Sequence, residues 1–237
     1  AGEGNVFISA DYSQQEPRFL SQLSNDENMI DAYVQNKDIY AWIASFIYNV
    51  PYEECKEFRP DGTKNPQGKE RRTSVKSIIL GLMYGRSTKS IAEQLGVSVQ
   101  KAQEITDKFF NSFPNVQNFI QHTEEFARVN GYVETAWGRK RRLPDMQLPE
   151  YEFKYEGNYA FDPLDFNSDE ELEVSEQDKH YYLGKLQRCR YFRDRLAIKE
   201  EAKRNGIIIK DNTGFIADAQ RQCVNSIIQG SSADCTK

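Results

Sequence analysis

Four side chains spaced four residues apart in the middle of the chain have the types that a nucleotide-binding helix needs. An α-helix would place them along one face, with little rotation from one to the next. Two cations one turn apart suit a chain of phosphates, and an aliphatic residue followed by an aromatic ring suits a sugar and a base. An amphipathic helix with a basic end is the alternative for such a spacing. The four residues are Arg72, Lys76, Leu80 and Tyr84.

A carboxylate follows a short apolar run near the start of the chain. Residues 5–10 have the composition of a β-strand, and Asp11 stands at or just past its end. A carboxylate in that position can hold Mg²⁺, a hard cation that prefers oxygen ligands. A turn or a helix cap uses the same residue type, so Asp11 alone does not decide between these interpretations.

Polar side chains form another row near the end of the chain. Arg221, Asn225 and Gln229 lie four residues apart, beside an apolar stripe that would face a core. An arginine and two long amides can bond base edges in the minor groove, where A·T and G·C pairs offer similar acceptors. The row predicts a helix that contacts the minor groove of DNA without distinguishing one base sequence from another. An ordinary solvated helix face is the alternative.

A basic segment lies between these two helices in the chain. Arg139–Arg142 follows a predicted strand at Gly131–Thr135 and a turn through Trp137 and Gly138. A solvated turn would account for these charges taken alone. With the three patterns above, however, the segment completes an ordered set that is similar to the motifs of one known family.

The four segments resemble, in order, conserved motifs of the DNA polymerase I family, or DNA polymerase family A. The resemblance covers about residues 5–145 and 217–237. It implies a mixed α/β (α+β), predominantly helical fold: the fingers and part of the palm of a right-hand DNA polymerase. It also implies template-directed DNA synthesis, with Mg²⁺, dNTPs and primer–template DNA as cofactor, substrate and partner. The matching segments are Asp11–Arg18, Arg72–Gly85, Gly131–Asp145 and Ala219–Gly230.

The resemblance assigns metal binding and the exclusion of ribonucleotides to the first of these segments. It implies that Asp11 binds two catalytic Mg²⁺ ions and that the backbone carbonyl of Tyr12 assists. Glu16 would exclude ribonucleotides by blocking the ribose 2′-hydroxyl. Gln14, in the same segment, is expected at the dNTP.

The resemblance also assigns roles along the central helix. Arg72 and Lys76 would hold the triphosphate, and Lys76 would protonate the departing pyrophosphate. Tyr84 would close over the new base pair. Leu80 stands where the family usually has Phe or Tyr, and Tyr40 where many members have His, so their contacts with the dNTP are expected to differ. The residues expected to touch DNA are Arg139, Arg221, Asn225 and Gln229.

The resemblance divides the chain into segments, one of which is longer than the usual family connection. Within that segment, acidic residues gather between Asp162 and Asp178, and nine basic residues lie between Lys179 and Arg204. We expect a palm segment at 1–30, fingers at 31–130, a template-side hairpin at 131–149, an insertion at 150–216 and a palm helix at 217–237.

The composition is typical of a mostly helical globular chain. Of the 237 residues, 38% are hydrophobic and 28% are charged, and the net charge is −5. No apolar run approaches the ~20 residues of a membrane span, and the N-terminus has no signal-peptide pattern. Four scattered cysteines form no CxxC pair, which argues against zinc and favours reduced thiols. We expect a protein of the bacterial cytoplasm, encoded by the bacterium or by a phage.

Apolar spacing and breaker residues predict the order of the elements. Residues 14–49 have helical spacing, and residues 58–70 have the composition of a loop. Residues 150–178, rich in Pro, Asp and Asn, indicate a mobile or inserted segment. Further helices are expected at 90–96, 98–113, 116–130, 180–204 and from about Ala217, and a short strand at 206–209.

Other functions stay open at this stage. The family carries its second metal-binding carboxylate in a His-Asp-Glu hairpin, and no such motif occurs before Lys237. We therefore expect a fragment that does not polymerise by itself, with a non-catalytic DNA-binding module or remnant as the alternative. Ile91–Ser98 has a helix-turn-helix pattern, but the charges of the next helix cancel. Glu16 disfavours a single-subunit RNA polymerase.

Overall fold

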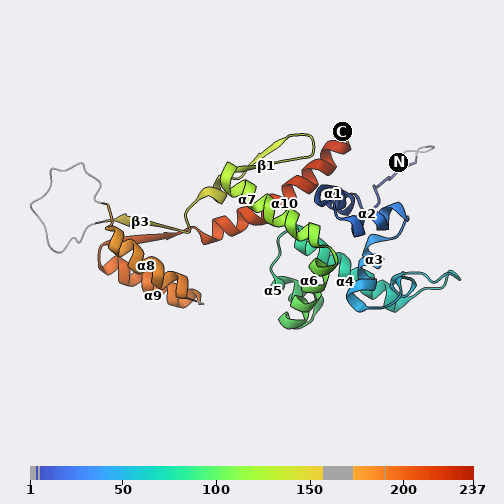
Figure 1. Cartoon of the computed structure of the whole chain (residues 1–237), viewed down its shortest axis with the longest axis horizontal. Coiled ribbons are helices and arrows are strands. Elements are labelled where there is room, and N and C mark those ends of the chain that lie inside the picture. The colour runs from blue at the N-terminus through green and yellow to red at the C-terminus, as the bar shows by residue number, and fades with distance from the viewer. Residues whose placement is uncertain (1–3, 5, 157–172, 190) are drawn as a thin grey trace, which may run out of the picture. The chain divides into compact units, whose positions relative to one another are not determined.

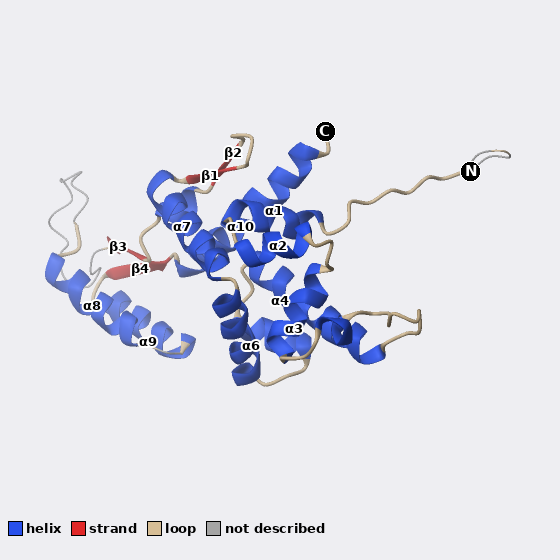
Figure 2. Ribbon diagram, turned by 45° about the vertical axis from the view of Figure 1, so that its right-hand side comes forward, coloured by secondary structure: helices blue, strands red, loops and turns tan. Residues whose placement is uncertain are grey.

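The computed structural model describes residues 4, 6–156, 173–189 and 191–237. The chain divides into two compact units, one of residues 1–146 with 219–237 and the other of residues 147–218. Helices dominate, and the strands are short (Figures 1 and 2). This confirms the predicted largely helical fold class. Among the described helices, none combines the length and the apolar character that a membrane crossing requires.

The first unit is a helical body with one small antiparallel hairpin. Its α-helices are α1 (Gln15–Ser24), α2 (Glu27–Val34), α3 (Ile39–Tyr48), α4 (Pro66–Met83), α5 (Thr88–Leu95), α6 (Val99–Ser112), α7 (Pro114–Asn130) and most of α10 (Thr213–Cys235). Its other elements are the 3-10 helices η1 (Tyr52–Cys55) and η2 (Pro144–Gln147) and the strands β1 (Tyr132–Glu134) and β2 (Lys140–Arg142).

Polar caps fix where the site-bearing helices begin. Asp38 accepts bonds from the backbone amides of Tyr40 and Ala41 at the start of α3. Asn65 caps α4 by accepting from the amide of Gly68, and Pro66 follows at the first helical position. Such side chains satisfy amides that have no partner inside the helix, so the sequence sets these starting points locally.

Two apolar cores hold the first unit together. The larger one packs α3, α4 and α6 around side chains such as Ile43, Ile79 and Phe109. The smaller one joins α7 and the β1–β2 hairpin to α10, with Val133 and Cys223 buried in it. Helix α10 contributes to both cores, which fixes the rotation of α10 and therefore the direction of its polar residues.

The second unit is a small α+β body with its own core. Strands β3 (Tyr151–Tyr155) and β4 (Ile207–Asp211) pair antiparallel, with Phe153 opposite Ile209. Helices α8 (Glu176–Arg188) and α9 (Phe192–Arg204) complete this unit (Figure 1). The core residues are Tyr151, Val174, Tyr182, Leu186, Ile198, Ala202, Ile207 and Ile209.

The strand predicted at residues 5–10 is wrong over the part that the structure describes. Asn5 lies outside the described residues, and residues 6–10 carry no strand assignment. Val6, Phe7 and Ile8 are 81%, 86% and 90% exposed. A β-strand needs a neighbour for its backbone bonds, and no described strand pairs with this segment.

Other predicted boundaries differ because of tertiary pairing and capping. Residues 151–155 form β3 rather than a mobile segment, whereas 157–172 lie outside the described residues. The predicted helix 180–204 is two helices, α8 and α9. Helix α10 starts at Thr213 rather than near Ala217, and α4 starts at Pro66, inside the predicted loop. The predicted helices at 90–96, 98–113 and 116–130 and the strand at 206–209 are confirmed within a few residues.

Candidate functional site

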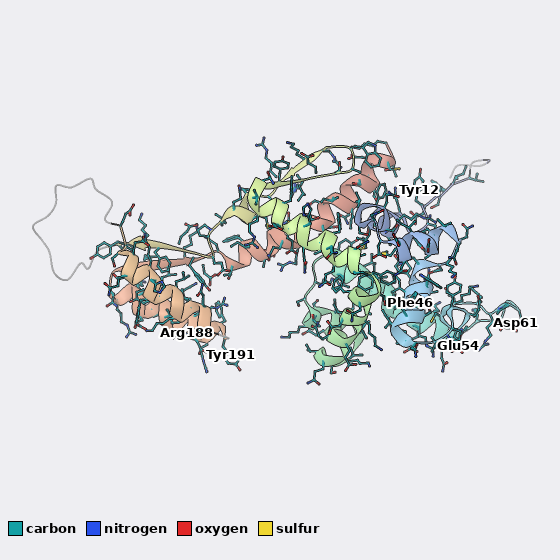
Figure 3. All side chains as sticks on the ribbon, in the orientation of Figure 1. Tyr12, Phe46, Glu54, Asp61, Arg188 and Tyr191 are labelled. Atoms are coloured by element: carbon teal, nitrogen blue, oxygen red, sulfur yellow. The ribbon has the colours of Figure 1, made fainter. Side chains whose placement is uncertain are left out.

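A cavity of about 490 Å³ lies in the first unit against α1, α3 and α4. The segment before α1 contributes carboxylate and backbone oxygens, and α4 contributes two cations. In Figure 3, Tyr12 projects from this segment, and its side chain is 64% exposed. All the residues that the sequence predicts for the metal and the nucleotide line this one cavity. They are Asp11, Tyr12, Gln14, Glu16, Tyr40, Arg72, Lys76, Leu80 and Tyr84.

Arg72 is held by a carboxylate that the sequence pattern did not single out. Its Nε donates to Asp38 Oδ2 at 2.8 Å, and its Nη2 lies 2.8 Å from the same oxygen. The other oxygen of Asp38 caps α3. Asp38 therefore fixes the Arg72 guanidinium relative to α3. The one sequence signal for it was an Asp directly before an apolar helix, which is typical of a cap.

Lys76 has no comparable partner. Its side chain is exposed, and its ammonium forms no ion pair with any residue that the structure describes. Its Nζ lies 6.0 Å from the centroid of the Tyr40 ring. An ammonium on a cavity wall that forms no close ion pair can attract anionic ligands, although Asp11 and Glu16 line the same cavity.

Tyr40 lines the cavity beside Arg72 and Lys76. The side chain is buried, and this burial raises the pKa of its hydroxyl to about 12, an effect that the charge of Arg72 partly offsets. The Arg72 guanidinium lies 5.5 Å from the ring centroid, so the ring faces two positive charges. Tyr40 therefore stays neutral at physiological pH and presents a ring rather than a charge.

Tyr84 and Glu16 close the opposite side of the cavity. The Tyr84 hydroxyl donates to Glu16 Oε2 at 2.8 Å. Burial raises the Tyr84 pKa, and the hydrogen bond to Glu16 raises it further, because both favour the protonated phenol. Leu80 lies between Tyr84 and Lys76 on α4 and packs partly against the larger core. The result is an apolar and aromatic end beside the cationic end.

Two features of the segment before α1 bear on ligand binding. Gln14 has φ 56° and ψ 38°, a left-handed conformation that is uncommon for a residue with a side chain. Asp11 is exposed, and the structure shows no group of three or more His, Cys, Asp or Glu side chains among the described residues that could hold a metal ion. Asp11 and the carbonyl of Tyr12 therefore supply hard oxygen donors but no complete set of ligands.

A groove of about 460 Å³ lies between the β1–β2 hairpin and α10 in the same unit. Two of the predicted DNA contacts on α10, Asn225 and Gln229, line it together with Arg139 from the hairpin. The remaining lining residues are also polar or small. They are Thr135, Lys140, Arg141, Gln222, Ser226 and Gly230.

Arg139 is anchored within this groove. Its Nη2 donates to the carbonyl of Gly230 at 3.1 Å and lies 3.1 Å from Asp234 Oδ1. Asp234 also accepts a bond from Thr135. A Cβ on Gly230 would come within 2.6 Å of Thr135 Cγ2, so the hairpin and α10 approach here as closely as a glycine permits.

Arg221 does not line the groove with Asn225 and Gln229. It packs instead against the end of α4, where a Cβ on Gly85 would lie 2.7 Å from Arg221 Cα. Asn225 and Gln229 line the groove, but Gln229 also bonds the side chain of Tyr84 at the end of α4, close to where Arg221 packs. The spacing of four residues predicted that the three side chains share one side of a helix. Only the packing of α10 shows which of them line the groove.

The helix-turn-helix alternative finds no support in α5 and α6. Gly96, with φ 65°, ends α5, and Ser98 caps α6, as that pattern requires. The charged residues of α6, however, are paired: Lys101 with Glu104, and Lys108 with the carbonyl of Ile47. A recognition helix would leave cations free for phosphates.

Comparisons with known proteins agree with the motif assignment. Residues 1–160 match the family model described as DNA polymerase family A. The chain is 35% identical over 147 residues to "DNA polymerase I, thermostable" of Thermus aquaticus, and 36% identical over 147 residues to "DNA polymerase I" of Chloroflexus aurantiacus. Each alignment covers 62% of this chain, but only 16% and 14% of the two relatives.

A solved structure shares the fold. It is the POL domain of Pol1 from M. smegmatis in complex with DNA primer–template and dNTP, with a TM-score of 0.61 and 24% identity. The match covers 95% of this chain and 27% of that one. At this identity the likeness shows the fold alone.

Proposed function

This chain belongs to DNA polymerase family A, and from that premise we propose that it carries the dNTP site and part of the primer–template site of a template-directed DNA polymerase. The reaction is nucleotidyl transfer from a dNTP to a primer 3′-hydroxyl. One observation carries the proposal: a single cavity gathers two cations, a neutral aromatic floor and two carboxylates from segments far apart in the sequence.

The cavity suits a triphosphate at one end and a sugar and base at the other. Arg72 and the unpaired Lys76 meet the phosphates, and Lys76 Nζ holds a proton that it can give to the departing pyrophosphate. Tyr84 and Leu80 face the base and sugar. Glu16 stands where a 2′-hydroxyl would meet its carboxylate, and the Tyr84 hydroxyl keeps that carboxylate in place.

The oxygen donors of this chain supply part of the ligand set that Mg²⁺ requires. The Asp11 carboxylate and the Tyr12 carbonyl would hold it, and Mg²⁺ commonly completes its shell with substrate phosphates and water. When bound, Mg²⁺ lowers the pKa of the attacking hydroxyl and stabilises charge on the leaving group. This part of the chain contributes one carboxylate to that chemistry, so we expect no primer extension by the chain in isolation.

The hairpin groove is the proposed contact for primer–template DNA. Arg139, fixed by Asp234, meets a phosphate or the template, and Asn225 and Gln229 meet base edges and sugars. Arg221 contacts DNA, on this proposal, from its place beside the end of α4. The domain assignment made above from the sequence belongs to the same proposal: a palm segment at 1–30, fingers at 31–130, a template-side hairpin at 131–149, an insertion at 150–216 and a palm helix at 217–237. A site of action in the bacterial cytoplasm also belongs to it.

Template-dependent dNTP binding tests the function. The chain is titrated with a fluorescent dNTP analogue and Mg²⁺, with a primer–template whose next template base either pairs with the analogue or mismatches it. We expect tighter binding with the matching template. Lys76→Ala should weaken binding about ten-fold or more, because a charge-assisted hydrogen bond contributes about 1.5–3 kcal/mol.

Lys101→Ala is the matched control, since Lys101 is a helical lysine paired with Glu104 and does not line the cavity. Equal affinity for matched and mismatched templates would contradict a template-directed enzyme. DNA binding without any dNTP binding would favour the non-catalytic DNA-binding alternative.

A further inference from the structure

The second unit exposes two aromatic rings that its own core does not use. Tyr191, the residue before α9, is 69% exposed, and Phe192, its first residue, is 70% exposed. Neither belongs to the core of that unit, which uses Ile198 and Ala202 from the same helix. Two large exposed rings at consecutive positions are unusual on a surface that faces only water.

Arginines flank these rings on both sides in the chain. Arg188 ends α8, and Arg193 follows Phe192 in α9; both side chains are exposed. Figure 3 shows Arg188 and Tyr191 at the same end of the α8–α9 pair. Leu196 lies one turn after Phe192 and is 45% exposed, which extends the apolar strip. These five residues are called the α8–α9 patch: Arg188, Tyr191, Phe192, Arg193 and Leu196.

Some cations of the second unit are paired with carboxylates and others are not. Lys179, Lys185, Lys199 and Lys210 each form a salt bridge with a carboxylate of the unit. Arg188 and Arg193 form no salt bridge within the part of the chain that the structure describes, and neither do Lys154, Arg195, Lys203 and Arg204. Arginines without carboxylate partners beside exposed rings leave positive charge for an external anion.

We propose that the α8–α9 patch binds single-stranded DNA. Tyr191 and Phe192 stack on unpaired bases, while Arg188 and Arg193 bind the phosphates between them. Exposed rings favour single strands over a duplex, because the bases of a duplex are already stacked on one another. Arginine combined with aromatic rings also serves binding without sequence preference. This site goes beyond the proposed function, which rests on the cavity and the groove of the first unit.

The test measures binding of the whole chain to a fluorescently labelled dT oligomer by anisotropy, at several salt concentrations. The double variant Tyr191→Ala/Phe192→Ala should raise the Kd roughly five-fold or more for each ring that stacks. Arg193→Gln should lower the slope of log Kd against log salt by about 0.7, the value for one phosphate contact on a single strand.

Two controls separate this site from the rest of the molecule. Tyr181→Ala removes another exposed ring of the same unit, one that contacts Lys185 and Glu201, and should leave the Kd unchanged. Asn225→Ala/Gln229→Ala should weaken binding to a primer–template junction while leaving the α8–α9 patch intact. The two sets of variants therefore test DNA binding by the groove and single-strand binding by the patch separately.

Photo-cross-linking of the unmodified chain to an oligomer that contains bromodeoxyuridine gives a second readout that needs no variant. The proposal predicts cross-linked peptides that include residues 188–196. It is overturned if the double variant binds the oligomer as tightly as the wild type, or if cross-links lie only in the first unit. A chain that self-associates through the patch without DNA, shown by loss of a dimer in the double variant, would also overturn it.

Discussion

The carboxylate of Asp38 joins helix α3 to Arg72 on α4. Its Oδ2 lies 2.8 Å from both Nε and Nη2 of Arg72, while its Oδ1 accepts from the amides of Tyr40 and Ala41 at 3.0 and 3.1 Å. One side chain thus caps a helix and holds a cation that lines the cavity of about 490 Å³. The two tasks can be separated by substitution, because an asparagine can still cap a helix but cannot form an ion pair.

Asp38→Ala should lower the free energy of unfolding by about 1 kcal/mol for the lost cap, plus up to about 1 kcal/mol for the partly exposed ion pair. Asp38→Asn should lose only the ion-pair contribution, because asparagine caps about as well as aspartate. Urea denaturation of the two variants measures the difference. Equal losses in the two variants would show that the cap contributes nothing.

Glu16→Ala should reduce the preference of the cavity for dNTP over rNTP. The carboxylate lines the sugar end of the cavity and is held by the Tyr84 hydroxyl, so its removal leaves room for a 2′-hydroxyl. Competition between dATP and ATP for the labelled analogue measures the ratio of affinities. Tyr84→Phe is the control, since it keeps the ring and removes only the hydrogen bond, and its effect should be smaller. An unchanged ratio of dATP to ATP affinity in Glu16→Ala would show that Glu16 does not exclude ribonucleotides.

Gly85→Ala should destabilise the first unit more than Gly96→Ala. Both glycines have left-handed backbones, with φ 62° and φ 65°, and an added Cβ costs about 1–2 kcal/mol in that region. At Gly85 the Cβ would also lie 2.7 Å from Arg221 Cα, whereas at Gly96 nothing lies within 4 Å. Thermal unfolding of the two variants provides the comparison. Equal melting temperatures would contradict the close approach of α4 to α10.

Asp211 should make the second unit sensitive to acid. Burial raises its pKa, but the hydrogen bonds from Thr213 and Lys199 together outweigh burial, so the folded pKa lies below the ordinary value of 3.8. A carboxyl whose pKa is lowered on folding contributes stability at pH values above its unfolded pKa. That stability is lost as the pH falls through the folded pKa.

Asp211→Asn removes this titration, so we expect the variant to be less stable than the wild type at pH 7. The difference should shrink as the pH is lowered below about 4. Urea unfolding, followed by a signal from the second unit at pH 7 and pH 3, measures it. A difference that stays constant over this range would contradict the role of the charged form.

Local patterns in the sequence were sufficient for the helix that carries the cations. The spacing from Arg72 to Tyr84 places these residues on one side of α4 because the 3.6-residue period is a local property, and Asn65 and Pro66 fix the start of the helix by local bonds. The resemblance to the family is confirmed by the match over residues 1–160, and the assignment of these side chains to a nucleotide site remains part of the proposed function.

Other features depended on residues distant in the chain. Residues 151–155 were included in the segment 150–178, which the sequence predicted to be mobile or inserted, and they form β3 because residues 207–211 supply its backbone partners. Residues 6–10 had the composition of a strand and remain unpaired among the described residues. A strand depends on its neighbour, so its own composition cannot decide whether it forms.

From its own residues the sequence indicated the family, the largely helical fold class and the residues that line one cavity. It could not determine which cation is neutralised. The ion pair of Arg72 with Asp38 joins two residues 34 positions apart, whereas Lys76 forms no ion pair with the residues that the structure describes. Nor could it separate Arg221 from Asn225 and Gln229, or show that Tyr191 and Phe192 lie outside their core. Helical spacing fixes which side chains share a face, but only packing decides what each face meets.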